Sequence, residues 1–277
     1  YTRPPLAGAT KTVSGTISGA QTWTGTVFLK GDVRIPQGAT LTILPGTKVL
    51  SDWVDNQGGG TDGTRIELIV DGGRLVVVGT AAAPVVFNSA ATSPARGDWY
   101  GLRFRSGSMT LTYANFDYGR KGLTIEGGGE VSMGYCSFRN SSESGAHVTV
   151  AGTYELNNCS FLNNGGSGLV ASDGGSRLTL TNSVISSNGS YGLQLNYNST
   201  LIDCVINQNS GTGLYCGPGL TLTRPRVEGN GGYGVDVFWN GTEGTATITG
   251  GNISSNRSRG ITLGYTTAVL QNVVVER

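Results

Sequence analysis

The stretch that decides the fold is 185–195, ISSNGSYGLQL, which returns as 206–216, INQNSGTGLYC, and again as 227–237, VEGNGGYGVDV. Each copy begins with an apolar anchor, has Asn at its fourth position and Gly at its eighth, and ends in an apolar–x–apolar triplet. Related copies occupy 161–171 and 253–263. The anchors recur every 21 to 26 residues, at Phe116, Phe138, Phe161, Ile185, Ile206, Val227, Ile253 and Val274.

A period of about 22 residues is typical of one turn of a β-solenoid. The alternating triplets predict short strands, each pairing with its equivalent one coil away at about 4.8 Å. Asn at a repeated bend can stack into an asparagine ladder, and Gly allows the chain to turn with positive φ. A leucine-rich repeat has a similar period, but its Leu-x-x-Leu-x-Leu signature is missing. We therefore predict an all-β, right-handed parallel β-helix of about ten coils in a single domain.

The regularity of the repeat divides the chain. Residues 1–25 are expected to form an N-terminal cap, and 26–108 irregular coils interrupted by a loop insertion at 51–64. Regular coils follow over 109–277. Because an open terminal coil exposes unpaired strand edges, we expect flanking domains beyond residue 277.

Composition excludes several classes of protein. The net charge of +1, with no clustered Lys/Arg stripe, argues against a nucleic-acid-binding protein. No run of apolar residues is long enough to span a membrane. The first residues, YTRPP, have no leader pattern, as expected of a trimmed or mature chain.

Two stretches resemble a known family. Residues 38–49, GATLTILPGTKV, are similar to the opening of many bacterial and archaeal surface proteins of the right-handed β-helix repeat family, within the pectate-lyase-like superfamily. Residues 70–87 followed by 97–104, GDWYGLRF, share this likeness, which extends over 26–277. The resemblance implies an extracellular or cell-surface location in a prokaryote. It does not fix an activity, because β-helices include lyases, hydrolases, epimerases, adhesins and spikes.

The four cysteines occupy inward positions of the repeat. Cys136, Cys159 and Cys204 each lie two residues before an anchor, and Cys216 ends a triplet. We expect buried thiols that pack as small apolar groups. A disulfide between Cys136 and Cys159, in neighbouring coils, is the alternative.

One lateral face carries the candidate ligand-binding residues. The middle residue of each triplet, and the residues flanking the Gly-triplet unit, should point outward. Aromatic rings can cover the C–H faces of a sugar while amide and carboxylate groups bind its hydroxyls. The alternative is that tyrosines merely favour exposed strand positions. In the later coils this face gathers Tyr191, Gln194, Tyr215, Tyr233, Asp236 and Phe238, with Trp239 beside them.

A second resemblance concerns catalysis. Tyr233-Gly-Val-Asp236 resembles the Tyr-Gly-x-Asp-Pro-His run of alginate epimerases and related lyases, which implies proton transfer by Tyr233 and a charged subsite at Asp236. Val237 and Phe238 replace the Pro and His of that run, and the single His147 lies four coils away. Tyr233, Asp236 and Arg259 are therefore candidate catalytic residues without a histidine base.

The insertion offers a candidate cation site. Asp52, Asp55 and Asp62 lie on a Gly-rich loop, and oxygen ligands of this kind suit Ca²⁺. The spacing matches neither an EF-hand nor a nonapeptide calcium repeat, so a solvated loop is the alternative. No other cofactor is expected.

Three functions remain open. The leading hypothesis is a non-catalytic secreted or surface module, an adhesin or rigid spacer, whose partner is a polysaccharide or surface glycan. The second is a polysaccharide lyase, epimerase or hydrolase. The third is a purely structural segment of a fibre or surface layer.

Overall fold

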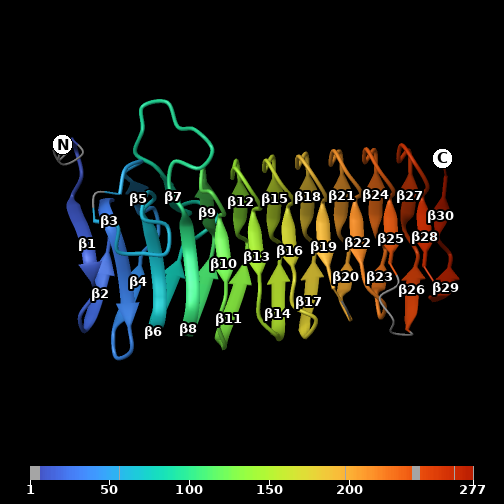
Figure 1. The fold of residues 1–277 in the computed structure, drawn as a ribbon, viewed down its shortest axis with the longest axis horizontal. Coiled ribbons are helices and arrows are strands. Elements are labelled where there is room, and N and C mark those ends of the chain that lie inside the picture. Colours follow the sequence, from blue (N-terminus) through green and yellow to red (C-terminus); the bar gives the residue numbers. More distant parts are fainter. Residues whose placement is uncertain (1–6, 56, 197, 239–243, 265, 277) are drawn as a thin grey trace. The chain divides into compact units, whose positions relative to one another are not determined.

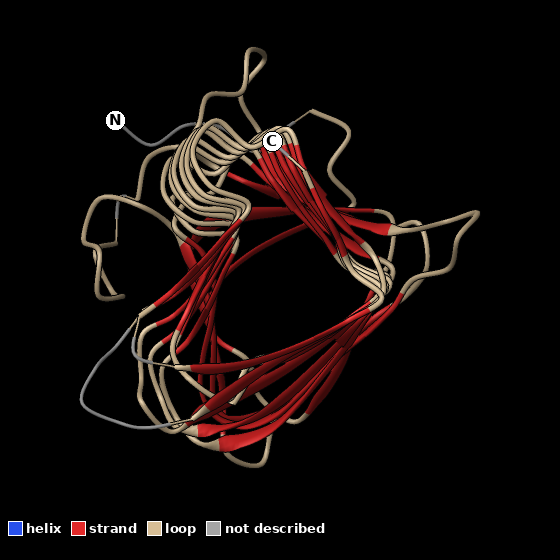
Figure 2. Cartoon of the chain, turned by 90° about the vertical axis from the view of Figure 1, so that its right-hand side faces the viewer, coloured by secondary structure: helices blue, strands red, loops and turns tan. Residues whose placement is uncertain are grey.

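The computed structural model describes residues 7–55, 57–196, 198–238, 244–264 and 266–276. These residues form strands and turns, and none of them lies in a helix (Figure 2). The described residues therefore include no helix that could cross a membrane. All strand pairings are parallel, and the chain winds through about eleven turns of β-solenoid. Contacts divide the chain into a first unit, residues 1–143, and a second unit, residues 144–277.

The first unit is built on three long, bent strands. Each strand contributes to two sheets: Leu68 pairs with Leu102 and with Val33 in one sheet, and Leu75 pairs with Met109 in the next. The three strands are β3 (Thr26–Pro36), β6 (Glu67–Val78) and β8 (Gly101–Thr112). The shorter strands of this unit are β4 (Thr40–Ile43), β5 (Lys48–Ser51), β7 (Val85–Ser89), β9 (Ala114–Asp117), β10 (Leu123–Ile125), β11 (Gly129–Gly134) and β12 (Ser137–Arg139).

The start of the chain continues the same pattern. Strands β1 (Lys11–Thr16) and β2 (Ala20–Trp23) pair in parallel with β3 and β4, and Trp23 is fully buried. Residues 7–25 thus add strands to the sheets. A capping role for residues 1–25 stays a prediction.

The second unit repeats three short strands per coil, drawn in Figure 1 as three rows of arrows. One row contains β13 (Ala146–Val148), β16 (Leu169–Ala171), β19 (Leu193–Leu195), β22 (Leu214–Cys216), β25 (Val235–Val237) and β28 (Ile261–Leu263). The next contains β14 (Gly152–Asn157), β17 (Ser176–Thr181), β20 (Thr200–Ile202), β23 (Thr221–Thr223), β26 (Thr245–Thr249) and β29 (Thr267–Gln271). The third contains β15 (Ser160–Leu162), β18 (Val184–Ser186), β21 (Val205–Asn207), β24 (Arg226–Glu228), β27 (Asn252–Ser254) and β30 (Val274–Val275).

The predicted anchors stack in register. Phe161 pairs with Ile185, Ile185 with Ile206 and Ile206 with Val227, and all of them are fully buried. The prediction of Val274 as the last anchor is wrong by one residue, because Val275 and not Val274 pairs with Ile253. Three valines in a row, 273–275, give no alternation from which the inward position could be read.

The asparagine ladder is confirmed. The side-chain amide of Asn188 donates to Asn209 Oδ1 at 2.9 Å, and Asn209 in turn donates to Asn230 Oδ1 at 2.9 Å. Equivalent bonds join Asn164 to Asn188 and Asn230 to Asn256, and all five residues are buried. The side-chain amides of Asn188, Asn209, Asn230 and Asn256 also donate to backbone carbonyl oxygens, so each of these buried amides has more than one partner.

The repeated glycines form a single file. A Cβ added to Gly192 would lie 2.5 Å from the Gly213 carbonyl oxygen, and one at Gly213 would lie 2.8 Å from that of Gly234. Glycine is therefore required here for the close approach of successive coils.

The four cysteines are buried thiols, as predicted. Cys136 Sγ lies 3.4 Å from the Gly134 carbonyl oxygen, and Cys204 Sγ lies 3.5 Å from that of Ile202. Burial raises the pKa of Cys204 to about 11 and that of Cys216 to about 12.

Candidate functional site

The predicted lateral face exists in the second unit. Strand register places Gln194, Tyr215, Asp236 and Thr262 side by side in one column, each on the strand of a successive coil. The triplet residues on either side of them point inward; Leu193, Leu214 and Val235, for example, are fully buried. The column residues are half-buried, so their outer parts meet solvent.

Three rings form what we call the aromatic stack: Tyr191, Tyr215 and Phe238. The ring centroids of Tyr191 and Tyr215 are 5.3 Å apart, and those of Tyr215 and Phe238 are 4.4 Å apart with the rings 13° from parallel. Tyr191 precedes its glycine, Tyr215 is mid-triplet and Phe238 follows its triplet, so the stack crosses three coils diagonally. Both faces of Tyr215 are thus covered by neighbouring rings, which leaves its edge and phenol hydroxyl to contact a ligand.

Asp236 stands beside the aromatic stack. It pairs in register with Tyr215, and burial raises the pKa of its carboxyl group. Burial, followed by the nearby Asp236 and Tyr191, likewise raises the pKa of Tyr215. Asp236 has no hydrogen bond or ion pair within the described part of the chain, so its carboxyl oxygens are open to a ligand.

The other predicted site residues lie on the same face. The Gly234 amide donates to the Arg259 carbonyl and the Gly213 amide to the Tyr233 carbonyl, which places Tyr233 and Arg259 in adjacent coils of one column. Arg259 is exposed and Tyr233 half-buried. Among the described residues, no hydrogen bond or ion pair joins the side chains of Tyr233, Asp236 and Arg259. Trp239 lies outside the described residues.

A charged cluster in the first unit was not predicted. Arg103 is the outward middle residue of the triplet 102–104, yet it is only 4% exposed. Its Nη1 donates to both carboxylate oxygens of Glu67, at 3.0 and 2.9 Å, and its Nη2 to both of Glu126, at 2.7 and 2.6 Å. Arg105 also donates to Glu126. We call Glu67, Arg103, Arg105 and Glu126 the arginine cluster.

The insertion folds over the arginine cluster. The backbone amides of Thr61 and Asp62 donate to the Glu67 carboxylate, and Arg105 Nη2 donates to the Thr61 hydroxyl. Arg120 Nη1 pairs with Asp62, 58 residues away in sequence. The described residues of this loop therefore cover the outward face of β6 and β8.

Asp32 lies beneath the same loop. Its Oδ1 accepts the Glu67 amide at 2.7 Å, whereas its buried Oδ2 has no hydrogen-bond partner among the described residues. Burial, reinforced by the negative charges of Asp55 and Glu67, raises the pKa of Asp32 to about 6.

Sequence patterns predict only part of this cluster. Alternation placed Glu126 outward, but Glu67 and Arg103 lie in the irregular coils, and the path of the loop that buries them is a tertiary feature. The loop carboxylates proposed to bind Ca²⁺ are engaged by protein groups, and Asp62 pairs with Arg65 and Arg120. Asp52 accepts the Trp53 amide and Asp55 accepts the amides of Gln57 and Gly58. Within the described ranges, no group of three or more His, Cys, Asp or Glu side chains could hold a metal ion.

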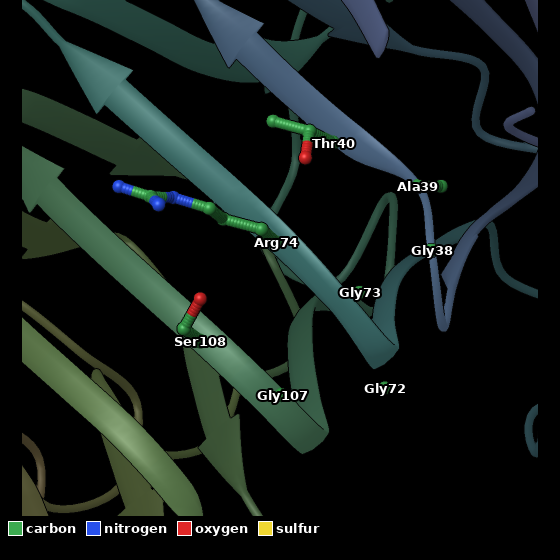
Figure 3. Close-up of a pocket in the computed structure, with 8 residues that line it drawn as sticks. All are labelled: Gly38, Ala39, Thr40, Gly72, Gly73, Arg74, Gly107 and Ser108. Atoms are coloured by element: carbon green, nitrogen blue, oxygen red, sulfur yellow. The ribbon is translucent and has the colours of Figure 1, made fainter. Parts of the chain in front are cut away.

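A shallow hollow of about 250 Å³ lies at a corner of the first unit (Figure 3). Thr40, Arg74 and Ser108 stand in register across β4, β6 and β8 at its rim. Its floor is glycine, since a Cβ on Gly73 would lie 2.5 Å from the Pro36 carbonyl oxygen. One guanidinium between two hydroxyls could hold a carboxylate or sulfate group.

Comparison with known proteins bears on the fold. The periplasmic alginate epimerase AlgG is 13% identical and superposes with a TM-score of 0.58 over 92% of this chain and 76% of its own. A double mutant of AlgG is 14% identical, with a TM-score of 0.59 over 93% and 76% of the two chains. At such low identity the likeness extends to the fold alone. No curated protein matches the sequence significantly.

Two family models match the sequence. The pectate-lyase-like β-helix domain matches residues 15–114, and the right-handed β-helix region matches residues 100–246. The second match spans more than half of the chain and includes the repeats at 185–195, 206–216 and 227–237. This chain therefore belongs to the right-handed β-helix family.

Proposed function

We propose that this protein is a secreted or cell-surface β-helix module that binds a polysaccharide through the aromatic stack and the polar side chains beside it. The observation that carries the proposal is the adjacency of three stacked rings to Asp236, a half-buried carboxyl group without a protein partner among the described residues. An open carboxylate next to phenol hydroxyls can bind sugar hydroxyl groups, while ring edges exclude water.

The binding mode differs from simple ring-on-sugar stacking. Because Tyr215 is covered on both faces, only the outer faces of Tyr191 and Phe238 can pack against a sugar ring. Gln194 and Asp236 would bind hydroxyl groups between these two ends. Successive coils lie about 4.8 Å apart, which is similar in scale to the repeat of an extended polysaccharide.

Replacement of Tyr215 tests the proposal. Binding of wild type and Tyr215→Ala to a panel of neutral and acidic polysaccharides would be measured by affinity electrophoresis and calorimetry. We expect the variant to bind at least about tenfold more weakly, since a central aromatic residue usually dominates an interface. Val184→Ala, an exposed position on β18 in another sheet, serves as the matched control. Absence of binding by wild type to every polymer would refute the proposal and favour a purely structural segment.

An enzyme acting on polysaccharide is the second candidate. Asp236, whose pKa is raised by burial, lies next to Tyr215 and three residues from Tyr233, so a carboxyl group and phenol groups that could take part in proton transfer lie close together. Wild type, Asp236→Asn and Tyr233→Phe would be incubated with uronate polymers, and new unsaturated ends, reducing ends and epimerised residues measured. Turnover by wild type that both variants lose supports this candidate. No turnover with any polymer removes it and leaves the binding proposal intact.

A further inference from the structure

Three tyrosines in the first unit, Tyr113, Tyr118 and Tyr135, adopt a backbone conformation that bulky residues avoid. Tyr113 has φ of 47° and Tyr135 has φ of 57°, both in the left-handed region. In that region Cβ crowds the backbone, and only Gly, Asn and Asp enter it readily. An aromatic residue at such a position carries a conformational cost that other interactions must offset.

The turn itself does not require tyrosine. Tyr113 follows β8 and Tyr135 follows β11, and the two strands pair to their last residues, Thr112 and Gly134. In the second unit, the corner after each equivalent strand is also left-handed, with φ between 47° and 55° where the residue is not glycine. The residues there are Asn158, Asn182, Asp203, Arg224 and Asn272. Four of these five are Asn or Asp, so the fold makes the same corner with a smaller residue at lower conformational cost.

Packing does not account for the tyrosines either. Their rings stack with centroids 4.5 Å apart and planes 10° from parallel. Tyr135 nevertheless remains 48% exposed, so the stack leaves nearly half of it in solvent. Neither phenol hydroxyl bonds to any residue that the structure describes. The pair thus combines an exposed ring surface with two available hydroxyls.

We propose that Tyr113 and Tyr135 form a second carbohydrate-binding site, which takes the C–H face of a pyranose ring against its aromatic surface. The phenol hydroxyls then bond to the hydroxyls at the sugar's edge, as amphipathic rings do at polar interfaces. The inference rests on the proposed function, because the ligand is a polysaccharide of the same class. It assigns that polysaccharide a contact in the first unit, apart from the aromatic stack of the second.

The strained backbone gives an unusually direct test. Tyr135→Asn places a residue that tolerates left-handed backbone at this corner, so its Tm should equal or exceed that of wild type. Its affinity for the polysaccharide bound by wild type should fall about two- to tenfold. Tyr135→Phe, which keeps the ring, should lose less. Tyr118→Asn is the matched control, since Tyr118 is also left-handed, with φ of 58°, but lies at another corner; its binding should be unchanged.

The outcomes separate this inference from the proposed function. If wild type binds no polysaccharide, the proposed function fails and this site fails with it. If Tyr215→Ala weakens binding while Tyr135→Asn binds as wild type does, only the second site is wrong. The inference would also be overturned if the Tm of Tyr135→Asn lay well below that of wild type and binding fell only as far as the fraction of folded protein fell. The rings would then serve the fold.

Discussion

At the scale of single residues, Asp32 shows how the loop alters the chemistry of a side chain. The residue is 7% exposed, and its carboxyl group faces the negative charges of Asp55 and Glu67. Its pKa rises from 3.8 to about 6, so the folded state binds the proton more tightly than the unfolded state. Stability is therefore lost as the pH rises through the interval between these values.

Substitution of Asp32 should remove that loss. In Asp32→Asn the amide oxygen can still accept the Glu67 amide, and a neutral side chain replaces the carboxylate that burial disfavours. We expect the difference in Tm between variant and wild type to grow from pH 4 to pH 7, in favour of the variant. Thermal unfolding measured across this range tests it, with the exposed Glu155→Gln as control. A Tm difference independent of pH would contradict the argument.

At the scale of elements, the asparagine ladder should be the most sensitive feature of the regular coils. Asn209→Ala removes the acceptor of the Asn188 amides and the donor to Asn230 and to the Ile185 carbonyl. Several buried groups lose a partner at once, so we expect a loss of about 3 kcal/mol in the free energy of unfolding. Urea unfolding measures it. The neighbouring Gln208→Asn, at an exposed left-handed corner, should change stability little; similar values for both variants would count against the ladder's role.

The arginine cluster gives a second prediction at this scale. Arg103→Met would leave the fully buried Glu67 carboxylate without its guanidinium partner. Breaking a buried ion pair on one side costs about 3–5 kcal/mol. The double variant Arg103→Met with Glu67→Gln removes both charges and should regain part of the loss. Equilibrium unfolding of the single and double variants tests this. If the double variant were no more stable than Arg103→Met alone, the unpaired charge of Glu67 would not be the cause of the loss.

Sequence reasoning succeeded for the elements that repeat and failed for those that do not. The positions of Asn188, Gly192 and the triplets followed from periodicity alone, because residues at the same position of the repeat stack on one another in successive coils. The diagonal aromatic stack could not be predicted from periodicity, since it depends on the directions in which the Tyr191 and Phe238 side chains point between neighbouring columns. The contact between Asp62 and Arg120 did not follow either, because it depends on how the loop folds back over the coils.

At the scale of the whole molecule, the repeat fixes the architecture but leaves the chemistry to individual outward positions. The period near 22 residues, with its apolar triplets and repeated Asn and Gly, was sufficient to predict the β-helix. The same inward residues would support many outward faces, which is why likeness to an epimerase fold does not carry an activity with it. The lateral face could be located from register, whereas its ligand must be found by binding measurements.

The thiols provide a measure of folding for the entire chain. Cys136 belongs to the first unit and Cys159, Cys204 and Cys216 to the second, and none is more than 1% exposed. A thiol reacts as its thiolate, which burial disfavours, as the raised pKa values of Cys204 and Cys216 show. We expect Ellman's reagent to label almost no thiol in native protein and four per chain in denaturant. Two labelled thiols in denaturant would instead support the Cys136–Cys159 disulfide, and rapid labelling under native conditions would show that coils open far more readily than a packed interior allows.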